Sequence, residues 1–267
     1  MKKRLQKIVS KLRNSPVEES EFFLFLESLE GFFCDPYQSL EYIKANGLPI
    51  ENENGSVYLR TALTPYMDDT YCIVDIETNG SKPNDAQIIE LGAIKIAQGK
   101  VVDRFESFVK CETIPEYITK ITGIREDDVK DAPTMQNVLI RFREFLGQAV
   151  FVAHNVEFDF NFISAMYARL ELGFLANRKL CTIDLARKTI EAERYGLEHL
   201  NSFLEINTEV SHRAYADALT AARVFDTALA NIPARVLTTE DLIEFSKSSV
   251  KKEKKKEPNG EEPQIPS

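Results

Sequence analysis

The sequence has no apolar stretch that approaches the roughly 20 consecutive residues needed to cross a lipid bilayer. Its opening, MKKRLQKIVSKLRN, has the basic start of a signal peptide, but Lys7, Lys11 and Arg13 interrupt any apolar core. An amphipathic basic helix is therefore the better interpretation. The four cysteines show no metal-ligand spacing, and two of them lie in expected buried strands. We expect reduced thiols and a cytoplasmic location.

The sequence also lacks an excess of positive charge. It has 33 basic residues against 42 acidic ones, which gives a formal net charge of −9. This charge argues against tight, unaided binding to long stretches of nucleic acid, because the phosphate backbone is itself anionic. It does not exclude a nuclease that holds only a chain end through metal ions. The acids could equally belong to a solvated surface, and composition does not choose between these interpretations.

The chain of 267 residues is long enough for one well-filled core and a small accessory domain, and its composition divides it into residues 1–66, 67–232 and 233–267. In the first region, the basic helix precedes a Phe-rich stretch, a helix capped by Asp35 and two short strands around an Asn-Gly turn. This order predicts a small helical, winged-helix-like module, with an irregular helical embellishment as the alternative. Lys44 stands alone on the candidate recognition helix, so DNA reading by this module is not expected.

The middle region alternates between strands and helices. A buried strand at 71–76 is followed by two long strands joined at Gln98-Gly99. Beyond them we expect an amphipathic helix after Pro133, a strand VFVAH, a helix at about 157–172, a strand KLCTIDL and more helices to about residue 230. This pattern predicts an α/β fold, with a mixed sheet and helices on both faces. The last region begins with a helix, TTEDLIEFSKS, and ends in a charged tail that we expect to be disordered.

Two acids stand at the end of the first buried strand, in the stretch YCIVDIETNG. Apolar residues fill both faces of this strand, which indicates a central strand buried between layers. Asp75 and Glu77 leave the same face roughly 6–7 Å apart, so both could reach one divalent ion. They should repel one another and resist burial unless a cation holds them. In open α/β sheets the functional crevice lies at such carboxyl ends of strands.

Two further acids lie on the buried faces of expected helices. Asp159 shares its helical face with Phe162, Ile163 and Met166, where a lone carboxylate is costly unless it is neutralised. A cap or a buried ion pair is the alternative role for it. Asp217 shares its face with small residues that would let the helix approach the sheet closely, namely Ala214, Ala221 and Val224. His212 lies five residues before Asp217, near enough to share one pocket with it.

Taken in order, these residues resemble the motifs of a known family. The motifs are D-x-E at 75–77, H-N-x-x-F-D at 154–159 and H-x4-D at 212–217. They are similar to those of the DEDDh 3′→5′ exonucleases, specifically the epsilon-type proofreading subunits of bacterial replicative DNA polymerases. IIELGAIKI, ITGI, CTIDLARK and GLEHLNSFL support the resemblance, which spans about residues 70–230. It implies a ribonuclease H-like, five-stranded mixed sheet flanked by helices. Asn79 departs from the family pattern, because many members have a second threonine there.

The resemblance implies a site for two divalent cations, Mg²⁺ or Mn²⁺, which stabilise the attacking and leaving oxygens of a phosphodiester. Four carboxylates suit such hard cations. By the same resemblance, Asp75 bridges the two ions, Glu77 and Asp217 complete one site, and Asp159 acts on the other through water. His212 is the expected general base, because an imidazole can accept a proton at neutral pH. The products would be nucleoside 5′-monophosphates.

For the substrate, the resemblance points to a single-stranded 3′ end. Ile124 matches an apolar wedge that packs on terminal bases, with a simple loop anchor as the alternative. Thr78 lies where its backbone and hydroxyl can meet the 3′ terminus. His154 and Asn155 are expected either to contact the terminal nucleotide or to support the site. Base stacking is tolerant of sequence, as proofreading requires.

These expectations lead to three hypotheses for function. The first is a metal-dependent 3′→5′ exonuclease that removes mispaired DNA ends and receives its substrate from a polymerase catalytic subunit or a sliding clamp. The second is trimming of RNA 3′ ends. The third is an inactive adaptor that binds a polymerase, against which the complete set of acids argues. Residues 241–245 faintly resemble a clamp-binding peptide but lack its usual glutamine, which favours an ordinary packing helix.

Overall fold

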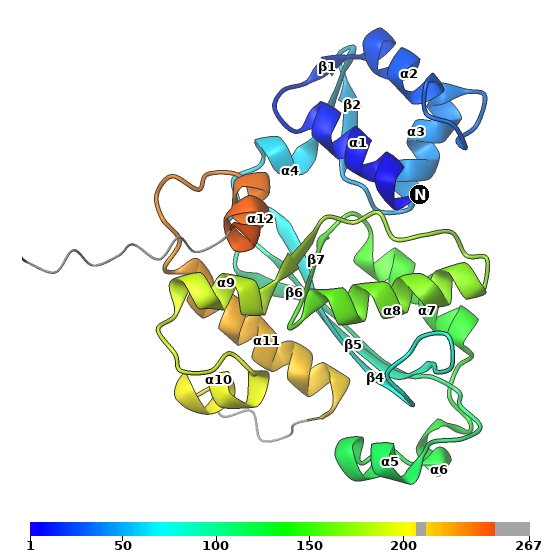
Figure 1. The fold of residues 1–267 in the computed structure, drawn as a ribbon, viewed down its shortest axis with the longest axis vertical. Helices are drawn as coiled ribbons and strands as arrows, with labels where there is room; N and C mark the ends of the chain where they lie inside the picture. Colours follow the sequence, from blue (N-terminus) through cyan, green and yellow to red (C-terminus); the bar gives the residue numbers. More distant parts are fainter. Residues whose placement is uncertain (207–211, 249–267) are drawn as a thin grey trace, which may run out of the picture.

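The computed structural model describes residues 1–206 and 212–248, and its centre is a five-stranded mixed sheet (Figure 1). The strand order is β6-β5-β4-β7-β8. The strands are β4 (Thr70–Thr78), β5 (Ile88–Ala97), β6 (Lys100–Phe108), β7 (Val150–Ala153) and β8 (Lys179–Cys181). β4 pairs antiparallel with β5 and parallel with β7, so it is the central strand that the sequence predicts.

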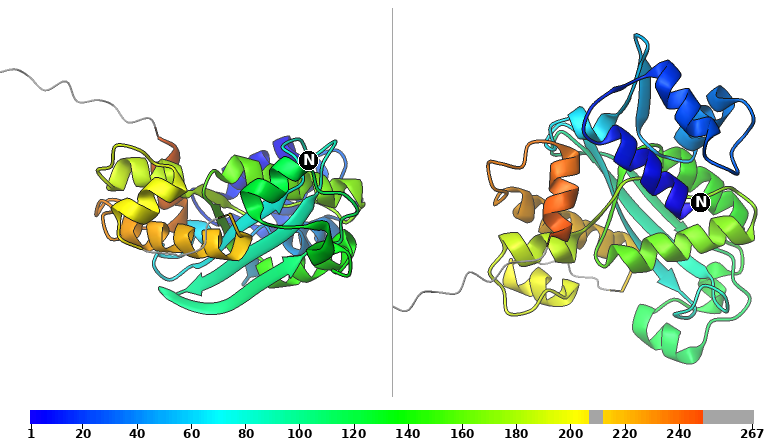
Figure 2. Two further views of the ribbon diagram at one scale, coloured as in Figure 1. Left: turned by 90° about the horizontal axis from the view of Figure 1, so that it is seen from below. Right: turned by 45° about the horizontal axis from the view of Figure 1, so that its top comes forward.

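Helices cover both faces of this sheet (Figures 1 and 2). α7 (Met135–Leu146) and α8 (Val156–Arg169) pack on the face that carries Cys72, Val74 and Ile76. The other face carries Tyr71 and Ile73 and is covered by α9 (Thr182–Thr189), α10 (Leu197–Phe203), α11 (Ala214–Leu229) and α12 (Thr239–Lys247). The two hydrophobic clusters explain why β4 is apolar on both sides.

One expected element differs from the structure. The strand KLCTIDL ends at Cys181, and the helix α9 starts at the next residue. Within α9, Leu185 and Ala186 are buried against α11 while the charged Arg187 and Lys188 lie near its end. The helical spacing of these apolar residues therefore outweighs the strand propensity of the segment TIDL.

The N-terminal residues form a module with a core of their own. It contains α1 (Lys2–Leu12), α2 (Glu19–Glu27), α3 (Pro36–Ala45) and a small antiparallel sheet of β1 (Val17–Glu18), β3 (Ser56–Leu59) and β2 (Ile50–Glu53). The expected Asn-Gly turn is present, with positive φ at Asn54 and Gly55. The expected helices and terminal hairpin are present, and Asp35 caps α3 as expected by accepting from Tyr37.

Buried ion pairs connect this module to the central sheet. α4 (Arg60–Leu63) follows β3, and Arg60 pairs with Asp69, which is 1% exposed. Glu240 of α12 is also buried and binds Arg178 through two contacts of 2.6 Å. Because Thr61 also donates to Glu240, α4 and α12 are held together. Leu242 and Ile243 of α12 are fully buried, which favours the interpretation of residues 241–245 as a packing helix over a clamp-binding peptide.

Two short helices, α5 (Glu116–Thr122) and α6 (Glu126–Val129), extend from the end of β6 and enclose a small cluster of isoleucines. All four cysteines are free. Among the described residues, no helix is long and apolar enough to cross a membrane. The expectation of a disordered tail concerns residues that lie mostly outside the described part of the chain.

The first turn of α11 lies directly on β5 at Gly92. A Cβ atom at this position would lie 2.3 Å from the backbone nitrogen of Tyr215 and 2.4 Å from the carbonyl carbon of Ala214. Gly92 is also the register partner of Asp75 on β4. The absence of a side chain at Gly92 therefore lets α11 begin directly beside the acids of β4.

We expect Gly92→Ala to lower the free energy of unfolding by about 1–3 kcal/mol, because the added methyl group must displace backbone rather than a flexible side chain. Urea denaturation followed by circular dichroism measures this change. Gly196→Ala is the matched control, since a Cβ there meets no atom within 4 Å and its φ of −71° suits any residue. Similar losses in the two variants would show that the contact between α11 and β5 is not a tight one.

Candidate active site

The C-terminal end of β4 presents two acids toward the start of α11. Asp75 and Glu77 lie on the same side of the strand and are half-buried. A register shift between Glu77 and Thr78 interrupts the pairing with β5 at this point. Such a bulge bends the strand locally and redirects its side chains.

The third acid comes from α8, on the opposite face of the sheet. Asp159 lies in the first turn of the helix and is 3% exposed. Its carboxylate accepts a hydrogen bond from the backbone of Ile76, between the two acids of β4. Asp159 therefore points toward the end of β4 and not into the apolar cluster that its neighbours Phe162 and Ile163 fill.

The fourth acid and the histidine come from α11. Asp217 accepts a hydrogen bond of 3.0 Å from the backbone nitrogen of His212, and this bond closes the turn before the helix. His212 has a positive φ of 59°, which the turn requires. Its ring and the carboxylates of Glu77 and Asp217 each offer a ligand atom within 4.8 Å of the others. The structure thus brings Glu77, His212 and Asp217 together, and Asp75 lies near enough to interact electrostatically with Asp159, Asp217 and Glu77.

A buried ion pair that the sequence analysis missed positions this segment. Glu90 of β5 is 1% exposed, lies opposite Glu77 in the sheet and binds Arg213 through contacts of 2.8–3.2 Å. Glu90 also accepts from the backbone nitrogen of Ala214 at 3.0 Å. Arg213 directly follows His212, so the pair holds the start of α11 on the sheet. An acid among the apolar residues IIELGAI at 88–94 was the available signal.

Burial and mutual repulsion together disfavour the charged forms of the four acids. Burial, and then the charges of Asp159 and Asp217, raise the pKa of Asp75 well above its ordinary value. Burial and the neighbouring Asp217 raise the pKa of Glu77 to about 7, although Arg213 opposes this shift. The pKa of Asp159 is raised by burial to about 8, and burial also raises that of Asp217. The site resists holding four negative charges by itself.

This donor set fits divalent cations of the magnesium type. All four acids offer oxygen ligands, and no cysteine is among them. A bound cation would remove the repulsion that raises these pKa values, so the cost of bringing the acids together would become a contribution to metal binding. Asp75 is the acid that interacts with each of the other three, which suits it to a bridging position.

His154 is bound on both ring nitrogens. Its Nε2–H donates to the carbonyl oxygen of Tyr195 at 2.9 Å, and its Nδ1 accepts from the Thr182 hydroxyl at 2.8 Å. Burial lowers its pKa to about 4. These contacts favour the structural-support interpretation of His154. Asn155 is exposed at the N-cap of α8 with a left-handed φ of 79°, so its side chain is free to meet a ligand.

The loop after Glu77 is held by polar side chains. The Thr78 hydroxyl donates to the carbonyl oxygen of Gly80 at 2.9 Å, and Thr78 is 9% exposed. Asn79 accepts from the backbone nitrogen of Gln87 at 2.8 Å and donates to the carbonyl oxygen of Thr113 at 3.2 Å. The residue that departs from the family pattern therefore fastens this loop to the segment after β6.

Ile124 lies inside the small cluster under α5 and α6, where it is 2% exposed. Its position favours the loop-anchor interpretation over that of a wedge against bases. On the same pair of helices, Tyr117 and Ile121 are the exposed apolar side chains, at 58% and 54%.

Residues 72–225 match the protein family described as Exonuclease. Two curated relatives are described as DNA polymerase III PolC-type. The relative from Caldanaerobacter subterraneus subsp. tengcongensis is 38% identical over 186 residues, which is 69% of this chain and 13% of the relative. The relative from Staphylococcus aureus is 37% identical over 183 residues, which is 67% of this chain and 12% of that relative. The chain therefore spans about an eighth of the length of these relatives. They are PolC-type polymerases, whereas the motifs had suggested a separate epsilon-type subunit.

Solved structures share the fold at low sequence identity. E. coli Exonuclease I in complex with a dA16 oligonucleotide matches with a TM-score of 0.55 and 18% identity, over 62% of this chain and 42% of that one. Cell-death related nuclease 4 matches with a TM-score of 0.54 and 16% identity, over 61% of this chain and 64% of that one. These likenesses confirm the predicted ribonuclease H-like architecture.

The raised pKa of Glu77 gives a test of the repulsion. Between about pH 4.5 and 7, folded protein holds the Glu77 proton more tightly than unfolded protein does, so metal-free protein loses stability as the pH rises. Glutamine cannot ionise. We therefore expect Glu77→Gln to be more stable than the wild type by about 2 kcal/mol at pH 8, and equally stable below pH 4.

Urea denaturation in the presence of a chelator measures this difference across the pH range. Glu27→Gln, which removes an exposed acid from α2, should show no pH-dependent gain. Added Mg²⁺ or Mn²⁺ should reverse the order of stability by binding the wild type more tightly. Equal stabilities of Glu77→Gln and wild type at pH 8 would contradict the proposed repulsion.

Proposed function

This chain belongs to the exonuclease family, and we propose that it hydrolyses phosphodiester bonds from the 3′ end of a single DNA strand with the help of two divalent cations. The observation that carries the proposal is the convergence of Asp75, Glu77, Asp159 and Asp217 beside an accessible histidine. Four mutually repelling carboxylates, all at least half-buried, have no structural advantage, so their arrangement supports a cation-dependent reaction over an adaptor role.

The position of each residue suits it to a different role in the proposed reaction. Asp75, Glu77 and Asp217 would hold one cation, and Asp75 and Asp159 would hold the other. When bound, the two ions would supply positive charge that neutralises the scissile phosphate. His212 is exposed and adjoins Glu77 and Asp217, so its ring can accept a proton from the attacking water. The products would be nucleoside 5′-monophosphates.

The preference for DNA rests on the relatives. The two described relatives are DNA polymerases, and the sequence match with this chain includes the segment that carries the four acids. We therefore propose that the chain removes mispaired 3′ ends during DNA replication, beside a polymerase catalytic subunit and in the cytoplasm. An exposed Asn155 at the start of α8 is available to the terminal nucleotide. A sliding clamp as second partner would need a surface other than the buried side of α12.

The decisive experiment is digestion of matched DNA and RNA oligonucleotides, each labelled at its 5′ end, with Mg²⁺, Mn²⁺ or a chelator. We expect stepwise shortening of single-stranded DNA with either metal and none with the chelator. Faster digestion of RNA would replace the DNA proposal by 3′-end trimming of RNA. If neither substrate were hydrolysed with either metal, the result would favour the role of an inactive adaptor.

His212→Ala should retain its fold and its metal affinity but lower turnover by about 10²–10⁴-fold, since the general base alone is removed. Asp75→Asn is the matched comparison, because it should lose metal binding as well as turnover. Isothermal titration with Mn²⁺ and steady-state hydrolysis of the DNA oligonucleotide measure the two properties. A His212→Ala enzyme with wild-type turnover would show that His212 is not the base.

A further inference from the structure

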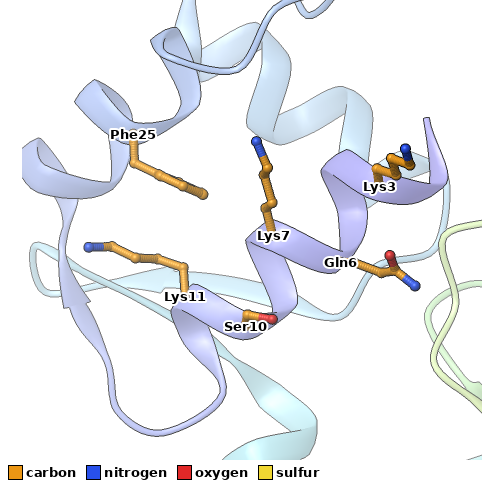
Figure 3. Close-up of a pocket in the computed structure, with 6 residues that line it drawn as sticks. All are labelled: Lys3, Gln6, Lys7, Ser10, Lys11 and Phe25. Carbon is orange, nitrogen blue, oxygen red and sulfur yellow. The ribbon is translucent and has the colours of Figure 1, made fainter.

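The exposed side of α1 carries a row of lysines. Ile8 and Leu12 bury one side of the helix in the N-terminal core, while Lys3, Lys7 and Lys11 follow one another at four-residue spacing. Figure 3 shows these three lysines with Gln6, Ser10 and the Phe25 ring of α2, lining one shallow hollow. The Lys11 ammonium lies 5.8 Å from the centre of that ring. Among the described residues, no acid lines this hollow.

A second hollow lies between α1 and α8, and it shares Gln6 and Ser10 with the first. Its cations are Lys2, Arg178, Lys179 and Lys247. Its described lining again includes no acid, although acids outnumber bases in the chain by 42 to 33. Phe160 and Phe174 contribute aromatic surface to its wall, and Lys179 lies 4.7 Å from the centre of the Phe160 ring.

A third hollow adjoins the second. It shares Lys179 and Lys247 with the second hollow and reaches Asn155 and Val156, at the start of α8. The acids Glu157 and Asp184 also line it. Asp159 lies in the same first turn of that helix. The pKa of Glu157 is lowered, first by its hydrogen bond from Lys179 and to a smaller extent by Lys2, which shows that the start of α1 lies near this turn. The three hollows form one continuous surface.

Part of the positive charge on this surface has no acidic counterpart. Lys11 pairs with Glu21, Arg178 with Glu240 and Lys179 with Glu157. By contrast, Lys2, Lys3, Lys7 and Lys247 form no ion pair with any residue that the structure describes. Burial lowers the pKa of Lys247, and the neighbouring Arg178 lowers it further. An anionic ligand on this surface would relieve that repulsion.

We propose that this surface binds the phosphate backbone of the single strand whose 3′ end occupies the active site. The strand would pass from Asn155 along α8 to the lysine row of α1, with bases able to stack on Phe25 and Phe160. This inference rests on the proposed function, and it gives the N-terminal module a role in holding substrate. Lysines and aromatic rings without an array of base-reading side chains suit binding that is tolerant of sequence.

The test compares long and short substrates. We expect Lys3→Glu/Lys7→Glu to raise the KM for a single-stranded 20-nucleotide DNA about tenfold, with kcat unchanged, because two phosphate contacts are lost. The slope of log KM against log salt concentration should fall by about 1.4, since each phosphate contact with a single strand contributes about 0.7. A trinucleotide is too short to reach α1, so its hydrolysis should not change.

Lys100→Glu/Arg104→Glu is the matched control, since it makes the same change in net charge on exposed residues of the edge strand β6. The control should keep the wild-type KM for both substrates. Equal effects of the two double variants, or an unchanged KM in Lys3→Glu/Lys7→Glu, would overturn the proposal. Equal losses on the trinucleotide and the 20-nucleotide DNA would also overturn it, since they would indicate a damaged fold.

Binding without hydrolysis separates this inference from the proposed function. Fluorescence anisotropy with a labelled 20-nucleotide single strand and a chelator measures affinity whether or not the chain is a nuclease. We expect about tenfold weaker binding by Lys3→Glu/Lys7→Glu than by the control. Failure of wild-type hydrolysis together with this loss of affinity would reject only the enzymatic proposal. Unchanged affinity together with normal hydrolysis would reject only the backbone-binding surface.

Discussion

Four carboxylates that repel one another meet at the end of one buried strand, and this repulsion is the constraint on which the structure around them depends. Burial and like charge together raise the pKa values of Asp75, Glu77, Asp159 and Asp217. A folded protein keeps such an arrangement only when the surrounding structure holds it firmly or when a cation relieves it. Both conditions shape this molecule, since its acids lie on rigid elements and together form a donor set for divalent ions.

The rigidity comes from contacts that approach the acids from both faces of the sheet. On one side, Gly92 lets the first turn of α11 rest on β5, and the pair of Glu90 and Arg213 fastens the same turn. On the other side, the backbone of Ile76 holds the carboxylate of Asp159. These contacts surround the residues proposed to bind cations and substrate, so small changes in packing there should alter the site before they alter the fold.

The chain separates its charges in space. A net charge of −9 suggests poor affinity for nucleic acid, yet the surface from Asn155 to α1 gathers lysines beside aromatic rings, and several of these lysines form no ion pair with a described residue. The acidic site and the basic surface have complementary tasks under the proposed function, because one holds cations and the other would hold phosphates. The net charge therefore limits nonspecific attraction over most of the molecule without preventing binding along one surface.

The sequence by itself determined the elements and the motifs. Apolar residues on both faces of 71–76 predicted a central strand, the Asn-Gly turn predicted a hairpin, and the ordered acids and histidines led to the exonuclease family. These features follow from local spacing, which a single chain displays directly. The local pattern predicted a strand over the whole of KLCTIDL. The strand ends at Cys181, and packing of α9 on α11 stabilises a helix from the next residue.

Only the tertiary structure decided which distant residues share a site. Glu90 and Arg213 are 123 residues apart, and no periodicity shows that they pair. The burial of Ile124, the two bonds of His154 and the continuity of the basic surface likewise depend on segments that meet only after folding. Spacing along the chain reports which face of an element a residue occupies, whereas the partner on that face is selected by packing between elements.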